Sequence, residues 1–216
     1  MNSDPPRAAV AACADSHRHL LAGLVGLTDE VAASPSLLPA WTVGHVLTHL
    51  ARNADGLARM IAAGELGEVA EMYPGGATMR GADIAAGAGR SASELVEDLR
   101  AASAGLDAVL ERAGDNVWAG SGQTIARPIS LREVPEFRRR EVEIHRVDLG
   151  LGYTFAHLPP DFLRAEVARM TGMWASRKPM GFTDLPPAAL ALAPADRLAW
   201  LTGRLEVAGV EAAALF

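Results

Sequence analysis

One stretch of the sequence places two metal-ligating side chains on a single helical face. Glu141 is followed four residues later by His145, and residues at that spacing project from the same side of a helix. Glu141 also falls on the apolar stripe of its segment, between Phe137 and Ile144, and Asp148 continues that stripe; an unpaired carboxylate would be costly to bury there. A carboxylate oxygen and an imidazole nitrogen at this spacing can bind one divalent metal ion.

A second segment supplies a third candidate ligand. His49 lies beside the apolar stripe of residues 43–63, three residues after Val46 and eight before Leu57. Two histidines and one carboxylate on facing helices leave one coordination position open, as a catalytic zinc site requires. The same side chains also fit simpler roles, a hydrogen-bonded core histidine and an ordinary helix pair, and spacing alone does not decide between these interpretations.

Four helical segments are expected to position these side chains. Periodicity and capping signals predict helices over residues 7–27, 43–63, 91–114 and 130–149, and the last two begin with capping boxes at Ser91 and Ser130. The glycine-rich stretch 73–89 is expected to form a loop with a short helical turn near 83–86, and residues 115–129 another loop. Four helices with long connections predict a bundle.

The pattern changes after about Gly152. Residues 161–174 and 195–201 are predicted to be helical, and the short apolar runs 188–193 and 205–214 favour a mixed α/β unit. We therefore expect a mainly α chain of two domains. A metal-binding four-helix bundle would occupy residues 1–152, and a small C-terminal α/β domain would occupy residues 153–216.

Composition narrows the possible partners. The chain of 216 residues is half apolar and 21% charged, with a formal net charge of −6, which is unfavourable for binding nucleic acid. Its one cysteine, Cys13, excludes an intrachain disulfide and a paired-thiolate zinc site, and a small buried residue is expected there. The sequence begins without a secretory pattern and has no long apolar stretch, so a cytoplasmic protein without membrane contact is expected.

The segments that carry the candidate ligands resemble a known family. Residues 41–54 (WTVGHVLTHLARNA), 73–76 (YPGG) and 138–149 (RRREVEIHRVDL), together with Arg80, are similar to the N-terminal part of mycothiol-dependent maleylpyruvate isomerases. These enzymes belong to the wider DinB-like bundle superfamily. The resemblance covers about residues 40–150.

The resemblance implies a metal- and thiol-dependent enzyme. His49, Glu141 and His145 would hold a divalent ion, expected to be zinc, which keeps the low-molecular-weight thiol mycothiol as a thiolate. Addition of that sulfur to the cis double bond of maleylpyruvate, rotation and expulsion would give fumarylpyruvate. Arg80 would help to bind the cofactor or a carboxylate. Residues 200–204 resemble a family segment that contributes an arginine, which makes Arg204 the candidate catalytic partner of a substrate carboxylate.

Two alternatives remain open from the sequence. The same ligands could activate mycothiol for S-transfer to an electrophile, and the protein could instead be a non-catalytic helical binding module. One such module, a zinc-dependent anti-sigma factor, is expected to contain Cys-x-x-Cys, which a single cysteine cannot form. His45 is expected to have a surface or capping role at the start of its helix. The other histidines and the arginine run are expected to face solvent: His17, His19, His157, Arg138, Arg139 and Arg140.

Overall fold

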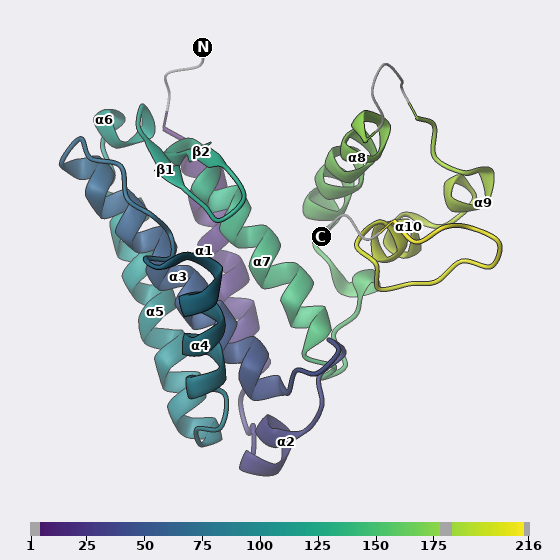
Figure 1. Cartoon of the computed structure of the whole chain (residues 1–216), viewed down its shortest axis with the longest axis horizontal. Coiled ribbons are helices and arrows are strands. Elements are labelled where there is room, and N and C mark those ends of the chain that lie inside the picture. Colours follow the sequence, from purple (N-terminus) through teal and green to yellow (C-terminus); the bar gives the residue numbers. More distant parts are fainter. Residues whose placement is uncertain (1–4, 178–182, 214–216) are drawn as a thin grey trace. The chain divides into compact units, whose positions relative to one another are not determined.

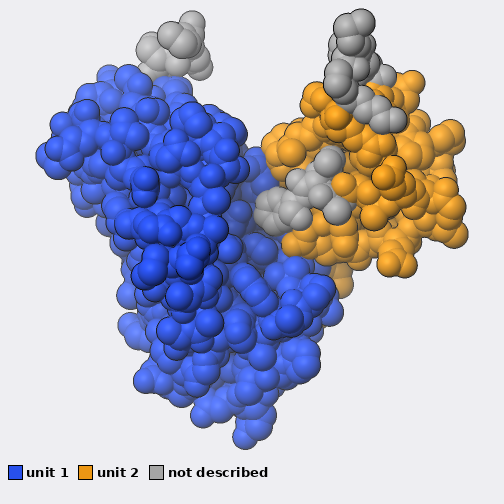
Figure 2. Space-filling view, viewed as in Figure 1, with its two compact units in different colours: residues 1–151 blue, residues 152–216 orange. Residues whose placement is uncertain are grey.

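Helices form most of the structure, a computed structural model that describes residues 5–177 and 183–213 (Figure 1). The chain divides into a first unit, residues 1–151, and a second unit, residues 152–216, which Figure 2 colours separately. Among the described residues, no helix is both long and apolar enough to cross a membrane.

The first unit is built around four long helices. Its principal helices are α1 (Arg7–Ala22), α3 (Val43–Glu65), α5 (Ala92–Arg112) and α7 (Val134–Asp148), and the short α2 (Asp29–Ala33) connects the first two. Each long helix packs against two others, in the order α3, α5, α1, α7 and back to α3 (Figure 1). The stripe predicted for α3 is confirmed, because four residues at helical spacing are fully buried: Val46, Leu50, Leu57 and Ile61.

Side-chain caps set where these helices begin. Thr42 accepts a hydrogen bond from the backbone N–H of His45, and the Nδ1 atom of His45 accepts one from the backbone N–H of Thr42. The predicted capping role of His45 is therefore confirmed. The capping boxes predicted at Ser91 and Ser130 also form, the second at the short 3-10 helix η1 (Leu131–Glu133) that leads into α7.

The glycine-rich stretch after α3 contains a helix of 12 residues, α4 (Gly76–Gly87), where the sequence predicts a loop. The glycines do not end the helix here; they allow α4 and α3 to approach each other closely. A Cβ atom on Gly87 would lie 2.6 Å from the side chain of Thr48, and one on Gly44 would lie 2.2 Å from the backbone oxygen of Ala88. Packing against α3 therefore overrides the low helix propensity of glycine and holds α4 at the side of the bundle.

Short elements also replace the loop predicted over residues 115–129. A single helical turn, α6 (Asp115–Trp118), precedes an antiparallel hairpin of β1 (Ser121–Gln123) and β2 (Pro128–Ser130). Each strand has three residues, which is too short for the alternating pattern that identifies strands in a sequence.

The described residues of the second unit form helices and turns. The elements are η2 (Phe155–His157), α8 (Pro160–Ser176), α9 (Pro187–Leu190) and α10 (Pro194–Leu201). α10 packs on α8, where the rings of Trp174 and Trp200 lie 4.9 Å apart between centroids. These helices agree with those predicted over residues 161–174 and 195–201.

The mainly α fold is thus confirmed, with one correction about where the strands lie. The run 188–193, which favoured an α/β unit, enters α9, and residues 205–213 contain no strand; residue 214 lies outside the described residues. A short apolar run does not distinguish a strand from a buried helical turn. Pro187 at the first position of α9 favours the helix.

Candidate metal centre

Three side chains from α3 and α7 converge on one point. The Nε2 atom of His49 lies 3.0 Å from Glu141 Oε2, and the Nε2 atom of His145 lies 3.6 Å from the same oxygen. The three ligand-type atoms all lie within 4.8 Å of one another. The structure therefore brings together the three residues that the sequence singles out, and we call this candidate metal site the metal cluster.

Asp148 contacts His145 at the ring nitrogen that does not face Glu141. Its fully buried carboxylate lies 2.8 Å from His145 Nδ1, so the ring donates that N–H and directs the lone pair of Nε2 toward Glu141. A carboxylate behind a metal-binding histidine fixes the tautomer of the ring and raises its basicity. The sequence places Asp148 on the same stripe as Glu141 but gives it no role, and its spacing of three residues from His145 is the signal that could have found it.

Burial and hydrogen bonding give His49 and Glu141 the protonation states that metal binding needs. Burial lowers the pKa of His49 to about 4, so the ring is neutral near pH 7. Burial alone would raise the pKa of Glu141, but the hydrogen bond with His49, together with the charge that His49 carries at acidic pH and the charge of Arg138, holds it at about 2. Neutral imidazoles beside an ionised carboxylate are the form in which these groups bind metals.

Arg80 reaches the cluster from α4. Its Nη2 atom lies 3.0 Å from His49 Nδ1, and its guanidinium carbon lies 5.5 Å from the centroid of the Tyr73 ring. Because an arginine can only donate, His49 accepts at Nδ1 here and carries its own proton on Nε2, toward Glu141. The predicted site residue Arg80 is thus next to the predicted ligands.

Two cavities meet at Tyr73 and Arg80. The smaller, of about 220 Å³, opens onto His49 and Glu141 and is also lined by Asn53. The larger has a volume of about 450 Å³, and half of its lining residues are charged: Arg52, Arg59, Arg80, Arg90, Asp55 and Asp83. The metal cluster therefore lies beside a polar space large enough for part of a small molecule.

Several polar residues lie elsewhere than the sequence predicts. His17, Arg138 and Arg139 are buried, with exposed fractions of 2%, 0% and 8%, where solvent exposure is expected from their local pattern. His19 and His157 are exposed as predicted, and Cys13 is fully buried as predicted. The burial of His17 and Arg138 depends on partners far along the chain, which a local pattern does not contain.

Arg204 lies in the second unit, in the turn after α10. Its backbone N–H donates to Ala199 O at 2.7 Å, and its Nη1 atom donates to the backbone oxygen of Thr202. Both contacts fix the position of Arg204 within the second unit. Its catalytic role stays a prediction.

The comparisons with known proteins agree with this architecture. A family model described as "Mycothiol maleylpyruvate isomerase N-terminal domain" matches residues 13–150. Two solved structures are similar in fold, a crystal structure of the mycothiol-dependent maleylpyruvate isomerase and one of its histidine-to-alanine mutant. Each has a TM-score of 0.81 and 24% sequence identity, and the match covers 93% of this chain and 90% of the other. No sequence among the curated proteins matches the chain significantly.

Proposed function

This chain belongs to the mycothiol maleylpyruvate isomerase N-terminal domain family, and from this we propose that it isomerises the cis double bond of a small anionic substrate of the maleylpyruvate type. Family membership makes the chain a mycothiol-dependent isomerase. The convergence of His49, Glu141 and His145 within 4.8 Å carries the rest of the proposal, because it provides a place for a thiol-activating ion.

The residues of the metal cluster fit a divalent ion, for which zinc is our candidate. The donor set is two imidazoles and one carboxylate, and three ligands leave one position open. A divalent ion bound there would hold the sulfur of mycothiol as a thiolate near neutral pH. Asp148 keeps His145 in the tautomer that this requires, because its carboxylate accepts a hydrogen bond from the Nδ1–H of the ring.

Arg80 would change partners when the site is loaded. Ligation through Nε2 puts the proton of a neutral His49 on Nδ1, where it opposes the N–H that Arg80 now donates. Arg80 would then turn from His49 and bind the cofactor or a carboxylate of the substrate. The adjoining cavity of about 450 Å³ provides room for that ligand.

The reaction needs no cysteine of the chain. Mycothiol, when bound, would supply a thiolate that adds reversibly to the substrate's double bond, with the electron pair taken up by the conjugated carbonyl. Arg204 would pair with a substrate carboxylate. Cys13 is buried and stays outside this chemistry. The proposed partners are small molecules and do not include nucleic acid. The proposed location is the cytoplasm, where thiols are kept reduced.

The test measures metal content and maleylpyruvate isomerisation in the wild type, in His49→Ala and in a control variant. The control is His19→Ala, which changes an exposed histidine. We expect wild type and the control to contain one metal equivalent and to convert maleylpyruvate only when mycothiol is present. His49→Ala should lose both properties. Unchanged metal content in His49→Ala would refute the proposed centre. Conjugation of mycothiol to a model electrophile without isomerisation would favour the S-transferase alternative.

A further inference from the structure

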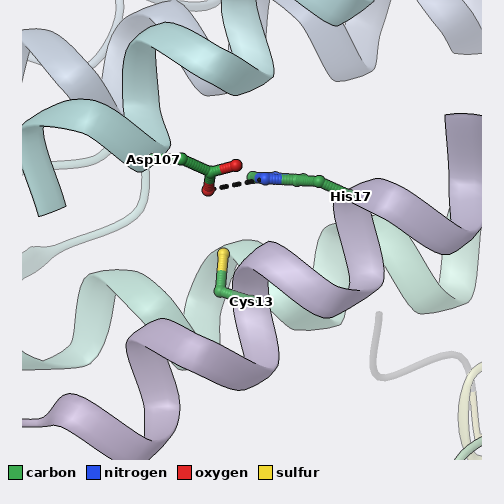
Figure 3. Close-up of side chains that lie close together, drawn as sticks. All are labelled: Cys13, His17 and Asp107. Carbon is green, nitrogen blue, oxygen red and sulfur yellow. Dashed lines mark hydrogen bonds and ion pairs between the residues drawn. The ribbon is translucent and has the colours of Figure 1, made fainter. Parts of the chain in front are cut away.

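A second group of ligand-type side chains lies inside the same bundle. The His17 cluster consists of Cys13, His17 and Asp107, whose ligand-type atoms also lie within 4.8 Å of one another. Figure 3 shows the ring of His17, on α1, pointing at the carboxylate of Asp107, on α5. The Nδ1 atom of His17 lies 2.9 Å from Asp107 Oδ1. His17 is buried, whereas the Asp107 side chain is 33% exposed.

The His17 cluster is not arranged for a metal ion. Asp107 accepts from Nδ1 of the ring, and Arg138 donates its Nε–H to Nε2 at 2.9 Å, so both ring nitrogens have protein partners. The guanidinium of Arg138 would also repel a cation at this position. Burial raises the pKa of Cys13 to about 12, so its sulfur stays protonated.

Arg138 connects this cluster with the helix that carries His49. Its Nη1 atom donates to the backbone oxygen of Leu50 at 2.8 Å and to Asn53 Oδ1 at 2.9 Å. Leu50 directly follows His49, and Arg138 precedes Glu141 by three residues. Arg138 therefore ties α7 to α3 about one turn from the contact between His49 and Glu141.

The hydrogen bonds form one chain with a member from each helix of the bundle. Asp107 is on α5, His17 on α1, Arg138 on α7, and Leu50 and Asn53 are on α3. A guanidinium donates in fixed directions, so an acceptor at Nε constrains where Nη1 points. A buried N–H without an acceptor is costly, and the group would turn toward another acceptor if the His17 ring were absent.

We propose that His17 is a positioning residue for the metal cluster: it holds Arg138 in the orientation that ties α3 to α7 and so sets the separation of His49 from Glu141. This role rests on the proposed metal site. Burial lowers the pKa of His17, which keeps Nε2 free of a proton and able to accept from Arg138. His17 acts on the site through Arg138.

Two substitutions separate positioning from packing. In His17→Asn the amide nitrogen takes the place of Nδ1 and can donate to Asp107, but nothing replaces Nε2. In His17→Gln the side-chain oxygen takes the place of Nε2 and can accept from Arg138. The probe is Co²⁺, followed by titration of the metal-free protein and by the visible absorption spectrum of the bound ion, which reports ligand geometry.

We expect His17→Asn to bind Co²⁺ about 10-fold more weakly than wild type and to show an altered spectrum. Losses of this size follow when residues that orient the metal ligands are mutated. His17→Gln should restore both properties. Wild-type binding and spectrum in His17→Asn would overturn the inference, and so would equal weakening by both variants, which indicates packing alone. Failure of wild type to bind Co²⁺ would instead refute the metal site of the proposed function.

Asp107→Ala tests the same role at a partly exposed side chain, in case His17→Asn does not fold. Without Asp107 the ring of His17 is no longer held with its Nδ1–H outward and Nε2 toward Arg138. We expect the same direction of change, a weaker affinity for Co²⁺ and an altered spectrum. Unchanged Co²⁺ binding in a folded Asp107→Ala protein would overturn the inference.

Discussion

The metal cluster and the His17 cluster contain similar side chains but differ in where their histidine nitrogens point. In the metal cluster, two Nε2 atoms face one oxygen of Glu141. In the His17 cluster, one ring lies between a carboxylate and a guanidinium, with a partner for each nitrogen. Donor atoms that converge on one point therefore support the proposed metal site, whereas histidine, cysteine and aspartate within a few ångströms of one another do not by themselves indicate one.

The largest expected difference is in metal affinity, when the carboxylate that accepts from each histidine is replaced: Asp148 for His145 and Asp107 for His17. Asp148→Asn removes the negative charge that supports His145 and should weaken metal affinity by about 10- to 100-fold. Asp107→Asn keeps an acceptor for His17 and should leave metal affinity near that of wild type. Titration with a chromophoric competing chelator measures both. Equal losses in the two variants would remove the distinction between the clusters.

The pH dependence of stability distinguishes the two clusters by a smaller effect. Burial lowers the pKa of both His49 and His17 below the ordinary 6.5, that of His49 to about 4. The unfolded chain therefore takes up these protons first, and stability present above pH 6.5 is lost as the pH falls toward 4. Each excluded proton contributes a slope of about 1.4 kcal/mol per pH unit.

The measurement is urea unfolding of the metal-free protein between pH 4 and pH 7. His49→Gln should flatten the profile more than His17→Gln, because the pKa of His49 is lowered further from 6.5, to about 4. A larger flattening by His17→Gln, or a flat wild-type profile, would contradict this ranking.

The smallest expected effect is that of the cysteine. Cys13 is fully buried and its thiol is protonated, so Cys13→Ala should cost about 1 kcal/mol of unfolding free energy through lost packing. Metal content and turnover should stay at the wild-type level, and iodoacetamide should not modify Cys13 in the folded protein. Loss of metal or of activity in Cys13→Ala would show that the two clusters are more closely coupled than their contacts indicate.

Local patterns were sufficient for the four long helices of the bundle, and they selected the three converging side chains as candidates, whereas the choice of a shared metal site over separate core roles rested on the family resemblance. The spacing of Glu141 and His145, and the position of His49 beside a buried stripe, are properties of single helices, and each helix is amphipathic over several turns. Periodicity therefore indicated which faces meet. The two capping boxes marked the helix starts for the same reason, since a cap involves residues only three positions apart.

Features that depend on distant partners could not be predicted in this way. The burial of Arg138 requires acceptors on α1 and α3, between 85 and 121 positions away. The helix α4 exists because glycines allow it to approach α3 closely, whereas glycine in isolation predicts a loop. The strands predicted in the second unit were wrong because runs of so few residues show no periodicity that distinguishes a strand from a helix.

The order of helices along the chain has a consequence for synthesis. The contact between His49 and Glu141 joins residues 92 positions apart, and that between His17 and Arg138 joins residues 121 positions apart. At about 5–20 residues per second, α3 waits roughly 5–20 seconds on the ribosome before the ligands on α7 are made. During that interval α1 and α3 lack the helix that covers one side of each. The metal cluster is therefore assembled last in its unit, after the rest of the bundle has been translated.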